Sequence, residues 1–494
     1  MKISELFSEK FIQTIEDQLL HAKMPDEELT IEYVDPRQFL SKNRIDLVCK
    51  LYYIECREKG RGIEFAKEVY RVHIESITYG RFSEVWNSEK NSLEKYFEVF
   101  DDLIDNIKTH GFDEKKSVIP VSEDSIILDG SHRVAAAIYF GIKVPVVRLK
   151  TPAWKNNYQA FMKKKQYAIP EKYMDFIAYQ YMAYKNLCYV AMIWPVSYRD
   201  PNYGTALKIL HQFSNVVYKK QVYLNYNGLA QLAMHTYMDA EWTGGFANRY
   251  TGIFTAVDER YGKKAPVTVL ILDDMPLDKI RQLKLLIRTV LHDGFAKIHI
   301  TDTREEALRL GKMLLNANSV QFLNDSFFFR YDDFVNEFWK FRSLALSSKL
   351  ENDLCLDTGA VLAVYGIRNT RDIDYLMVSD DKTDLLSDFD KHTQQYYDGF
   401  AADISCEEII YNWFDHFYCF DIMFSSLESV RILKQKRNEK KDRRDVQLIK
   451  KLETKCPYKK EYYKRRRKKM LKNYTSLRYY YHMLKKTVRR KPTL

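Results

Sequence analysis

Two aspartates separated by one residue, Asp372 and Asp374, have the spacing and surroundings that metal chemistry requires. They stand in a run rich in Ile, Tyr, Leu, Met and Val, which predicts a buried strand. Side chains two residues apart point to the same face of a strand, so we expect both carboxylates on one face. Two such carboxylates repel each other unless a cation lies between them, and oxygen ligands favour Mg²⁺. An ordinary strand that ends in a solvated turn fits the same residues.

A small pair, Gly359-Ala360, lies upstream of the aspartates. Small residues at a strand-to-helix turn let backbone N–H groups approach phosphate oxygens. A Gly-small pair, a spacer and Asp-Ile-Asp together resemble the polymerase-β type of the nucleotidyltransferase superfamily over residues 340–450, although Gly or Ser is usual where Ala360 stands. The resemblance implies an NTP-binding, Mg²⁺-dependent domain over 336–454, with Arg368 placed to reach a phosphate.

The same resemblance implies a third carboxylate on a later strand. Asp421 lies in the middle of an apolar run, where a lone acid is costly unless it faces a metal. We therefore predict Asp421 as a catalytic residue and third metal ligand, with Asp403 and Asp415 as alternatives. Lys434 and Lys441 on the following predicted helix are further candidates for phosphate binding, but for either lysine alone a solvated basic helix face is the better explanation.

A second candidate site is the turn formed by Asp129, Gly130, Ser131, His132 and Arg133, which opens a predicted helix. Free N–H groups and the helix dipole bind anions at a helix start, and Gly130 permits close approach. A cation at this end is unfavourable without an anion, so Arg133 favours phosphate binding. A simple N-cap by Asp129 or Ser131 would give the same pattern.

This turn and its flanks resemble the ParB/sulfiredoxin fold over residues 70–150. The resemblance implies a domain over 66–150 that binds a nucleotide such as ATP or CTP, and some members phosphorylate small hydroxylated molecules. Ser131 replaces the cysteine of sulfiredoxin, so we do not expect reduction of sulfinic acids. A kinase would need an acidic base, for which Glu84 is our choice and Glu75 the alternative.

The middle of the chain offers weaker candidates at predicted turns. They are His299, Asp302, Glu305, Glu306, the Trp242–Gly245 turn and the Tyr226–Gly228 turn. A metal at His299 and Asp302 would lack a third ligand, and a capped helix in a structural or acceptor-binding domain explains these residues more simply.

The element pattern predicts a multidomain α/β and α+β protein. Its expected parts are a helical extension (1–65), the ParB/sulfiredoxin-like domain (66–150), a helical then α/β middle domain (151–335), the nucleotidyltransferase-like domain (336–454) and a basic helical tail (455–494). We further expect a strand over 69–77, a parallel βαβ unit within 265–302, and one long helix over 427–453.

The apolar runs and the cysteine spacing of the sequence indicate where the protein is located and argue against structural zinc. We expect a cytoplasmic protein, because no signal peptide and no membrane-spanning apolar run is apparent. The seven cysteines lack CxxC spacing, which favours reduced thiols over structural zinc.

Positive charge is concentrated in the tail. Residues 455–494 contain sixteen Lys or Arg and one acid, or +15, so with a total of +11 the remainder carries −4. Interleaved Tyr, Leu and Met suit an anionic membrane surface, here the inner membrane, and also suit nucleic acid. A solvated basic tail is the plainer alternative.

We therefore expect a bifunctional enzyme of bacterial surface-polysaccharide biosynthesis. One site would transfer a nucleotidyl group to a small phosphorylated or hydroxylated acceptor, and the other would bind a nucleotide or act as a kinase. The alternative is a nucleic-acid-directed protein, either a tRNA-modifying nucleotidyltransferase toxin or a ParB-like CTP-dependent DNA-binding protein. We expect nucleic acid less because the body of the chain is slightly acidic.

Overall fold

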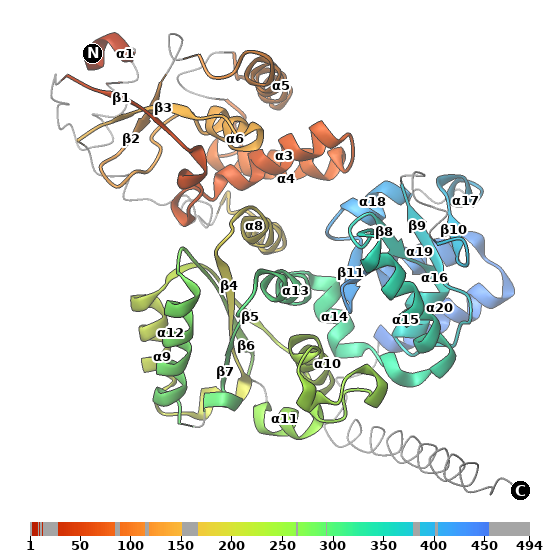
Figure 1. Ribbon diagram of the computed structural model, residues 1–494. Helices are drawn as coiled ribbons and strands as arrows, with labels where there is room; N and C mark the ends of the chain where they lie inside the picture. Colours follow the sequence, from red (N-terminus) through yellow and green to blue (C-terminus); the bar gives the residue numbers. More distant parts are fainter. Residues whose placement is uncertain are drawn as a thin grey trace, which may run out of the picture.

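The computed structural model describes residues 2–7, 9, 12, 28–83, 89–113, 118–150, 166–262, 265–292, 294–378, 386–400 and 404–453. Helices are combined with three separate sheets, one in each successive part of the chain (Figure 1). This agrees with the predicted mixture of α and β structure over several parts. Across these residues, the structure contains no helix with the length and apolar character needed to span a bilayer.

The N-terminal part contains a three-stranded sheet with the order β1-β3-β2. Strand β1 pairs antiparallel with β3 (Ile31 opposite Val147), so residues before position 65 share a sheet with residues near 147. Four helices pack together beside it through α3–α4, α3–α6 and α5–α6 contacts. The elements are β1 (Ile31–Val34), α3 (Asp46–Lys59), α4 (Ile63–Ile77), α5 (Leu93–His110), β2 (Ile119–Val121), α6 (Ser131–Phe140) and β3 (Val144–Arg148).

The predicted strand over 69–77 is wrong, because these residues belong to helix α4. Its buried positions include Val69, Tyr70, His73 and Ile74, which form one stripe at helical spacing. The β-branched composition suggested a strand, but packing of this stripe in the helical core decided the outcome.

The middle part is built on a four-stranded sheet with the order β5-β6-β4-β7, in which every neighbouring pair is antiparallel. Helices α9 and α12 share a separate core with one face, and α13 packs on β4 from the other core (Figure 1). The elements are α8 (Glu171–Tyr184), β4 (Cys188–Ile193), α9 (Tyr203–Phe213), β5 (Asn215–Val222), α10 (Tyr226–Tyr237), α11 (Ile253–Arg260), β6 (Val267–Asp273), α12 (Leu277–Val290), β7 (Ile298–Ile300), α13 (Arg304–Leu314) and α14 (Ala317–Asp325).

The predicted parallel βαβ unit is present only in a split form. Strands β6 and β7 run parallel to each other, but antiparallel β4 lies between them. The start of this part, expected to be helical, contains helices α8 and α9 but also strands β4 and β5. Strand β4 is buried at all six positions, so its sequence shows no alternation.

The C-terminal part contains a five-stranded sheet with the order β10-β9-β8-β12-β11. Strands β8 and β12 are parallel, whereas β9 and β11 run antiparallel to their neighbours β8 and β12. The elements are α15 (Asp332–Ser347), β8 (Leu354–Leu356), α16 (Thr358–Val364), β9 (Asp374–Met377), β10 (Asp390–His392), α17 (Gln394–Asp398), α18 (Cys406–Tyr411), β11 (His416–Cys419), β12 (Ile422–Ser425), α19 (Leu427–Arg437) and α20 (Lys440–Glu453).

The long helix predicted over 427–453 is instead two helices. Asn438 adopts a left-handed conformation (φ 53°) that ends α19, and α20 begins at Lys440. The basic tail of residues 455–494 lies outside the described residues.

Candidate active site

The candidate site lies at one end of the C-terminal sheet, where the ends of strands β8, β9, β10 and β12 are adjacent. Asp374 begins β9, and its carbonyl accepts a 2.9 Å hydrogen bond from the N–H of Asp357, the residue after β8. Asp390 is the register partner of Asp374 on β10, and Ser425 ends β12 beside Asp357. The mixed sheet topology therefore brings together side chains from four separate segments.

Asp374 is held by Thr358, whose hydroxyl donates a hydrogen bond to the Asp374 carboxylate. Thr358 has φ 41°, an unusual left-handed conformation for a β-branched residue. A strained backbone such as this one persists only where the surrounding structure holds it in place. Strain of this kind is frequent at functional sites.

Asp357 is the most buried acid of the site, with 1% of its surface exposed. Its carboxylate accepts hydrogen bonds from Ser425 Oγ (2.6 Å), from the Tyr397 hydroxyl and from His392 Nδ1 (3.3 Å). Burial raises the pKa of Asp357, but His392 and the two hydroxyl groups more than offset it and leave the pKa below its ordinary value. Asp357 is therefore a fixed negative charge inside the site.

The His392 ring lies between the carboxylates of Asp357 and Asp374. While Nδ1 contacts Asp357, Nε2 lies 3.9 Å from Asp374 Oδ1. Its ring stacks on Tyr396 with a centroid separation of 4.0 Å. Burial lowers the pKa of His392, but the Asp357 hydrogen bond and the charges of Asp357 and Asp374 produce a net increase. The two neighbouring carboxylates therefore favour the protonated form of this ring.

Asp372 lies just before β9 and is exposed, so the prediction that both aspartates occupy the strand is wrong by two residues. Within the described part of the chain, no cation pairs with its carboxylate. Asp372 and Asp374 still provide two oxygen ligands in close sequence, and Mg²⁺ is commonly bound through one or two carboxylates together with substrate phosphates. The two carboxylates are oxygen ligands of the kind that Mg²⁺ takes.

Asp421 does not join this site, and its prediction as a third metal ligand is wrong. Phe420 (φ 48°) and Asp421 (φ 68°) form the two-residue turn between β11 and β12, at the edge opposite Asp357. The Asp421 carboxylate pairs with Arg309 Nε and Arg342 Nη2, each at 3.0 Å. Burial raises the pKa of Asp421, but the two guanidinium groups bring it below its ordinary value.

The alternatives to Asp421 do not complete a carboxylate triad. Asp403 lies outside the described residues. Asp415 lies one residue before β11, near the correct edge, but the charges that act on it come from Glu408 and Lys172. Burial, with a contribution from Glu408, raises the pKa of Asp415 to about 6.

The basic residues predicted to bind phosphate in this domain contact acidic side chains of the chain itself. Arg368 Nε contacts both carboxylate oxygens of Asp445 at 3.1 Å. Lys434 is buried and pairs with Asp445 at 2.9 Å and with another acid of α20, so it is a structural cation and not a phosphate ligand. Lys441 is exposed, 3.3 Å from Glu439.

Gly359 and Ala360 also serve local packing. Both are buried in the first turn of α16, and the Ala360 N–H donates to the Asp357 carbonyl at 3.1 Å. A Cβ atom on Gly359 would lie 3.0 Å from Thr370 Oγ1, so a glycine makes room for Thr370. Their predicted contact with phosphate is not supported by this arrangement.

The N-terminal candidate turn begins α6 as expected. Gly130 has φ 84°, and an added Cβ would lie 2.5 Å from Ile119, so glycine is required there. Arg133 Nη2 pairs with Asp129 Oδ2 at 3.1 Å, and His132 Nε2 contacts the Tyr70 hydroxyl at 2.8 Å. Because Asp129 supplies an anion, Arg133 no longer requires an external phosphate for electrostatic balance.

Neither predicted kinase base is confirmed. Glu84 lies outside the described residues. Glu75 pairs with Arg71 at 2.7 Å on helix α4. Ser131 is half-buried at the start of α6 and remains a predicted phosphate contact.

The middle-domain candidates form ordinary structural contacts. His299 Nε2 lies 2.7 Å from Glu306, and Thr303 caps α13, as the capping-box pattern predicts. Asp302 pairs with Lys284 at 2.9 Å.

Sequence reasoning missed Asp357, His392, Tyr397 and Ser425. Asp357 was recognisable as an acid directly after a short apolar strand, but no sequence signal connects it with the other three. In the described ranges, no group of three or more His, Cys, Asp or Glu side chains is arranged so that it could hold a metal ion.

Comparison with known proteins adds no family assignment. No protein-family model, curated protein or solved structure matches this chain. The resemblances to nucleotidyltransferases and to the ParB/sulfiredoxin fold therefore stay predictions that rest on the motifs and on the geometry above.

Proposed function

We propose that the C-terminal part is a Mg²⁺-dependent nucleotidyltransferase that acts on a small hydroxylated or phosphorylated acceptor. One observation carries this proposal. Asp374, which accepts a hydrogen bond from Thr358, lies at the same end of the sheet as the Asp357–His392 pair. Exposed Asp372 adds a second carboxylate that no described cation neutralises. Such a concentration of acids at a strained turn is typical of a functional site.

The side chains of this site would have separate tasks. Asp372 and Asp374 would hold Mg²⁺ with the nucleotide phosphates, and the bound ion would stabilise charge on the pyrophosphate that leaves. Thr358 fixes the orientation of Asp374 through its hydroxyl. Asp357 fixes the orientation of His392, whose Nε2 then faces the space beside Asp374.

The wider role follows from the sequence resemblances. We propose that the acceptor belongs to bacterial surface-polysaccharide biosynthesis, that the N-terminal unit binds a second nucleotide, and that the basic tail holds the protein at the inner membrane. Deletion of residues 455–494 should then abolish association with anionic liposomes. Unchanged association would contradict the proposal for the tail.

The central activity is tested by release of pyrophosphate from each of the four NTPs with Mg²⁺ and a panel of sugar phosphates and polyols. We expect Asp374→Asn to reduce release by about a hundredfold or more, because a lost catalytic electrostatic contact costs at least this much. Asp421→Asn should retain activity, since Asp421 lies at the opposite edge. Equal loss in both variants, or full activity of Asp374→Asn, would contradict the assignment.

A further inference from the structure

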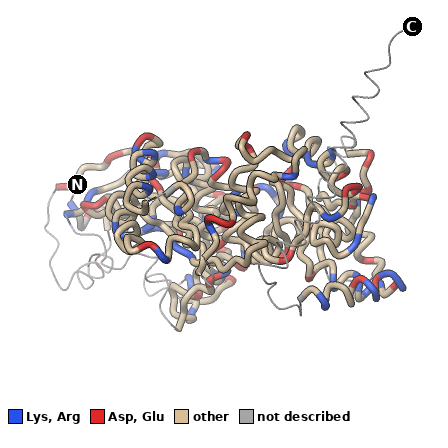
Figure 2. The backbone as a smooth tube through the Cα atoms, turned by 90° about the horizontal axis from the view of Figure 1, so that it is seen from below, with Lys and Arg blue, Asp and Glu red and all other residues tan. Residues whose placement is uncertain are grey.

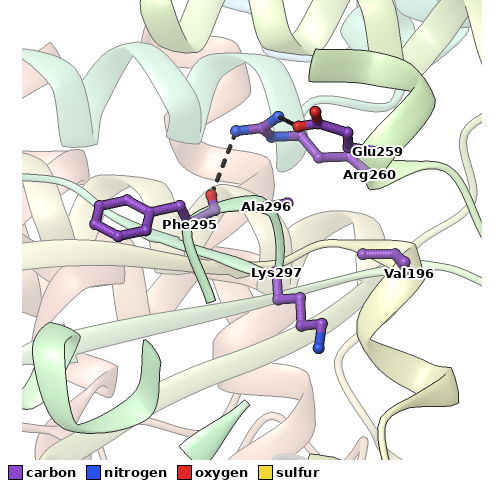
Figure 3. A pocket seen from close by; sticks show the side chains of 6 residues that line it. All are labelled: Val196, Glu259, Arg260, Phe295, Ala296 and Lys297. Atoms are coloured by element: carbon purple, nitrogen blue, oxygen red, sulfur yellow. Dashed lines mark hydrogen bonds and ion pairs between the residues drawn. The ribbon is translucent and has the colours of Figure 1, made fainter. Parts of the chain in front are cut away.

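A pocket lies in the middle part of the chain, at one end of the four-stranded sheet. Its volume is ≈ 510 Å³, and Val196, Glu259, Arg260, Phe295, Ala296 and Lys297 line it (Figure 3). These residues come from the end of α11 and from two short 3-10 helices, η3 (Pro195–Arg199) and η6 (Gly294–Ala296), and from the residues beside them. None of these segments contributes to the Asp372–Asp374 site.

Arg260 is a buried cation without a close carboxylate partner. It is 7% exposed, and its guanidinium lies between the rings of Trp194 and Tyr237, 5.6 and 5.4 Å from their centroids. The nearest carboxylate, that of Glu259, is 3.9 Å away on a side chain that is 58% exposed. A buried charge with so little compensation is costly, so an anionic ligand would stabilise it.

Two hydrogen bonds use only part of the five N–H donors of Arg260. Nη1 donates to the Ala256 carbonyl at 2.8 Å. Nη2 donates to the Phe295 carbonyl at 3.3 Å (Figure 3). Nε is buried, and no acceptor in the described part of the chain meets the geometry of a hydrogen bond to it. Burial raises the pKa of Tyr237, although Arg260 acts in the opposite direction, so the Tyr237 hydroxyl stays neutral at pH 7.

Lys297 does not supply the positive charge of the pocket. Its ammonium contacts Asp200 Oδ2 and the His292 carbonyl, each at 2.6 Å, and in Figure 3 it points away from Arg260. Its carbon stem lines the pocket instead. Arg260 is therefore the cation of the pocket toward which an anion would be drawn.

Apolar groups also line the pocket. Val196 and Ala296 contribute aliphatic surface, and the Phe295 side chain is at the rim with the residue 70% exposed. The guanidinium of Arg288 lies over the Phe295 ring, 4.3 Å from its centroid, which fixes the ring and adds positive charge nearby.

We propose that this pocket binds a small molecule that combines a carboxylate or phosphate group with a planar or apolar body. The anionic group would contact Arg260, and the body would lie against Phe295 and Val196. Charge-assisted hydrogen bonds from a guanidinium suit either anion, and the pocket volume is within the usual range for small-molecule sites. This site is separate from the proposed nucleotidyl-transfer site.

Calorimetric titration of the full-length protein tests the proposal with benzoate, phenyl phosphate and neutral benzyl alcohol as probes. We expect at least one anion to bind at millimolar concentration and benzyl alcohol not to bind. A preference for benzoate would identify a carboxylate ligand, and a preference for phenyl phosphate would identify a phosphate ligand. If neither anion binds, or if benzyl alcohol binds equally well, the proposal is wrong.

Two substitutions locate the binding. Arg260→Gln should abolish it, and Phe295→Ala should weaken it about tenfold, because an aromatic contact of this kind contributes about that factor. Phe295 is exposed, so its variant tests the pocket even if Arg260→Gln fails to fold. Phe213→Ala removes an equally exposed phenylalanine on α9 (60% exposed) and should leave affinity unchanged, as should Asp372→Asn. Wild-type affinity in Phe295→Ala would overturn the proposed location.

Discussion

Thr358 has a strained backbone and also contacts the proposed metal ligand Asp374. Its φ of 41° places a β-branched residue in a region that normally favours glycine, and its hydroxyl contacts Asp374. A Gly at this position would relieve the strain but would lose the hydroxyl. The presence of Thr therefore indicates that the contact with Asp374 offsets the conformational cost.

We predict that Thr358→Val lowers nucleotidyl transfer about tenfold, equivalent to about 1.4 kcal/mol, because Asp374 loses one hydrogen bond while the side-chain shape is kept. Thr358→Ser keeps the hydroxyl and should retain activity. Initial rates of pyrophosphate release measure both variants. An unchanged rate in Thr358→Val would show that this hydroxyl has no part in the reaction.

Among the larger elements, the β11–β12 hairpin places half-buried Asp421 beside two arginines. Its turn requires positive φ at two residues, and its acid links α13 and α15 through Arg309 and Arg342. Asp421 therefore has a structural role, because its carboxylate joins these two helices.

We predict that Asp421→Asn lowers the free energy of unfolding by about 1–3 kcal/mol, because two partly buried guanidinium groups lose a charged partner. Urea unfolding measures the change. Asp278→Asn, which changes an exposed acid in the first turn of α12, is the control and should alter stability by less than about 0.5 kcal/mol. Equal stability of Asp421→Asn and wild type would show that the two ion pairs contribute little.

The sequence predicts those elements whose pattern is local. Strand β6, helix α12 and strand β7 lie within the unit predicted over 265–302. The α4 helix was mistaken for a strand because its β-branched residues outweighed its helical spacing.

The site was only partly predictable because it depends on contacts between distant segments. Asp372 and Asp374 form a local motif, which sequence reveals. The Asp357–His392 contact joins residues 35 positions apart, and only the β10–β9–β8 order brings them together. The pairing of Arg368 with Asp445, 77 positions away, was hidden for the same reason.

Across the whole molecule, opposite charges are interspersed along the described backbone (Figure 2). Neutral histidines are buried in all three parts of the chain. Burial is the largest cause that lowers the pKa of His73 and His132 well below the ordinary value of 6.5, and it lowers the pKa of His235 to about 3 and of His416 to about 4.

This burial predicts acid-sensitive folding. The unfolded chain takes up protons on these histidines near pH 6.5, whereas the folded chain resists protonation until the pH is much lower. Folding stability should therefore fall as the pH decreases from about 6.5, by about 2 kcal/mol at pH 5 for a histidine such as His235. Urea unfolding at pH 7 and pH 5 measures this loss.

The variant His235→Phe should show a smaller loss between these two pH values, because one proton-binding group is removed. His110→Phe changes a histidine that is exposed at the end of α5 and should keep the wild-type pH dependence. Identical pH dependence in His235→Phe and wild type would contradict the assignment of acid sensitivity to this buried ring.

The most direct test of the central claim is thermal unfolding of the full-length protein with each NTP, with and without Mg²⁺, in wild type and in Asp372→Asn. Asp372 is exposed, so its substitution should leave the unliganded melting temperature unchanged. We predict that one NTP raises the melting temperature of the wild type only with Mg²⁺, and that this increase disappears in Asp372→Asn. An increase of the same size in both proteins would show that the nucleotide binds elsewhere and would contradict the proposed site.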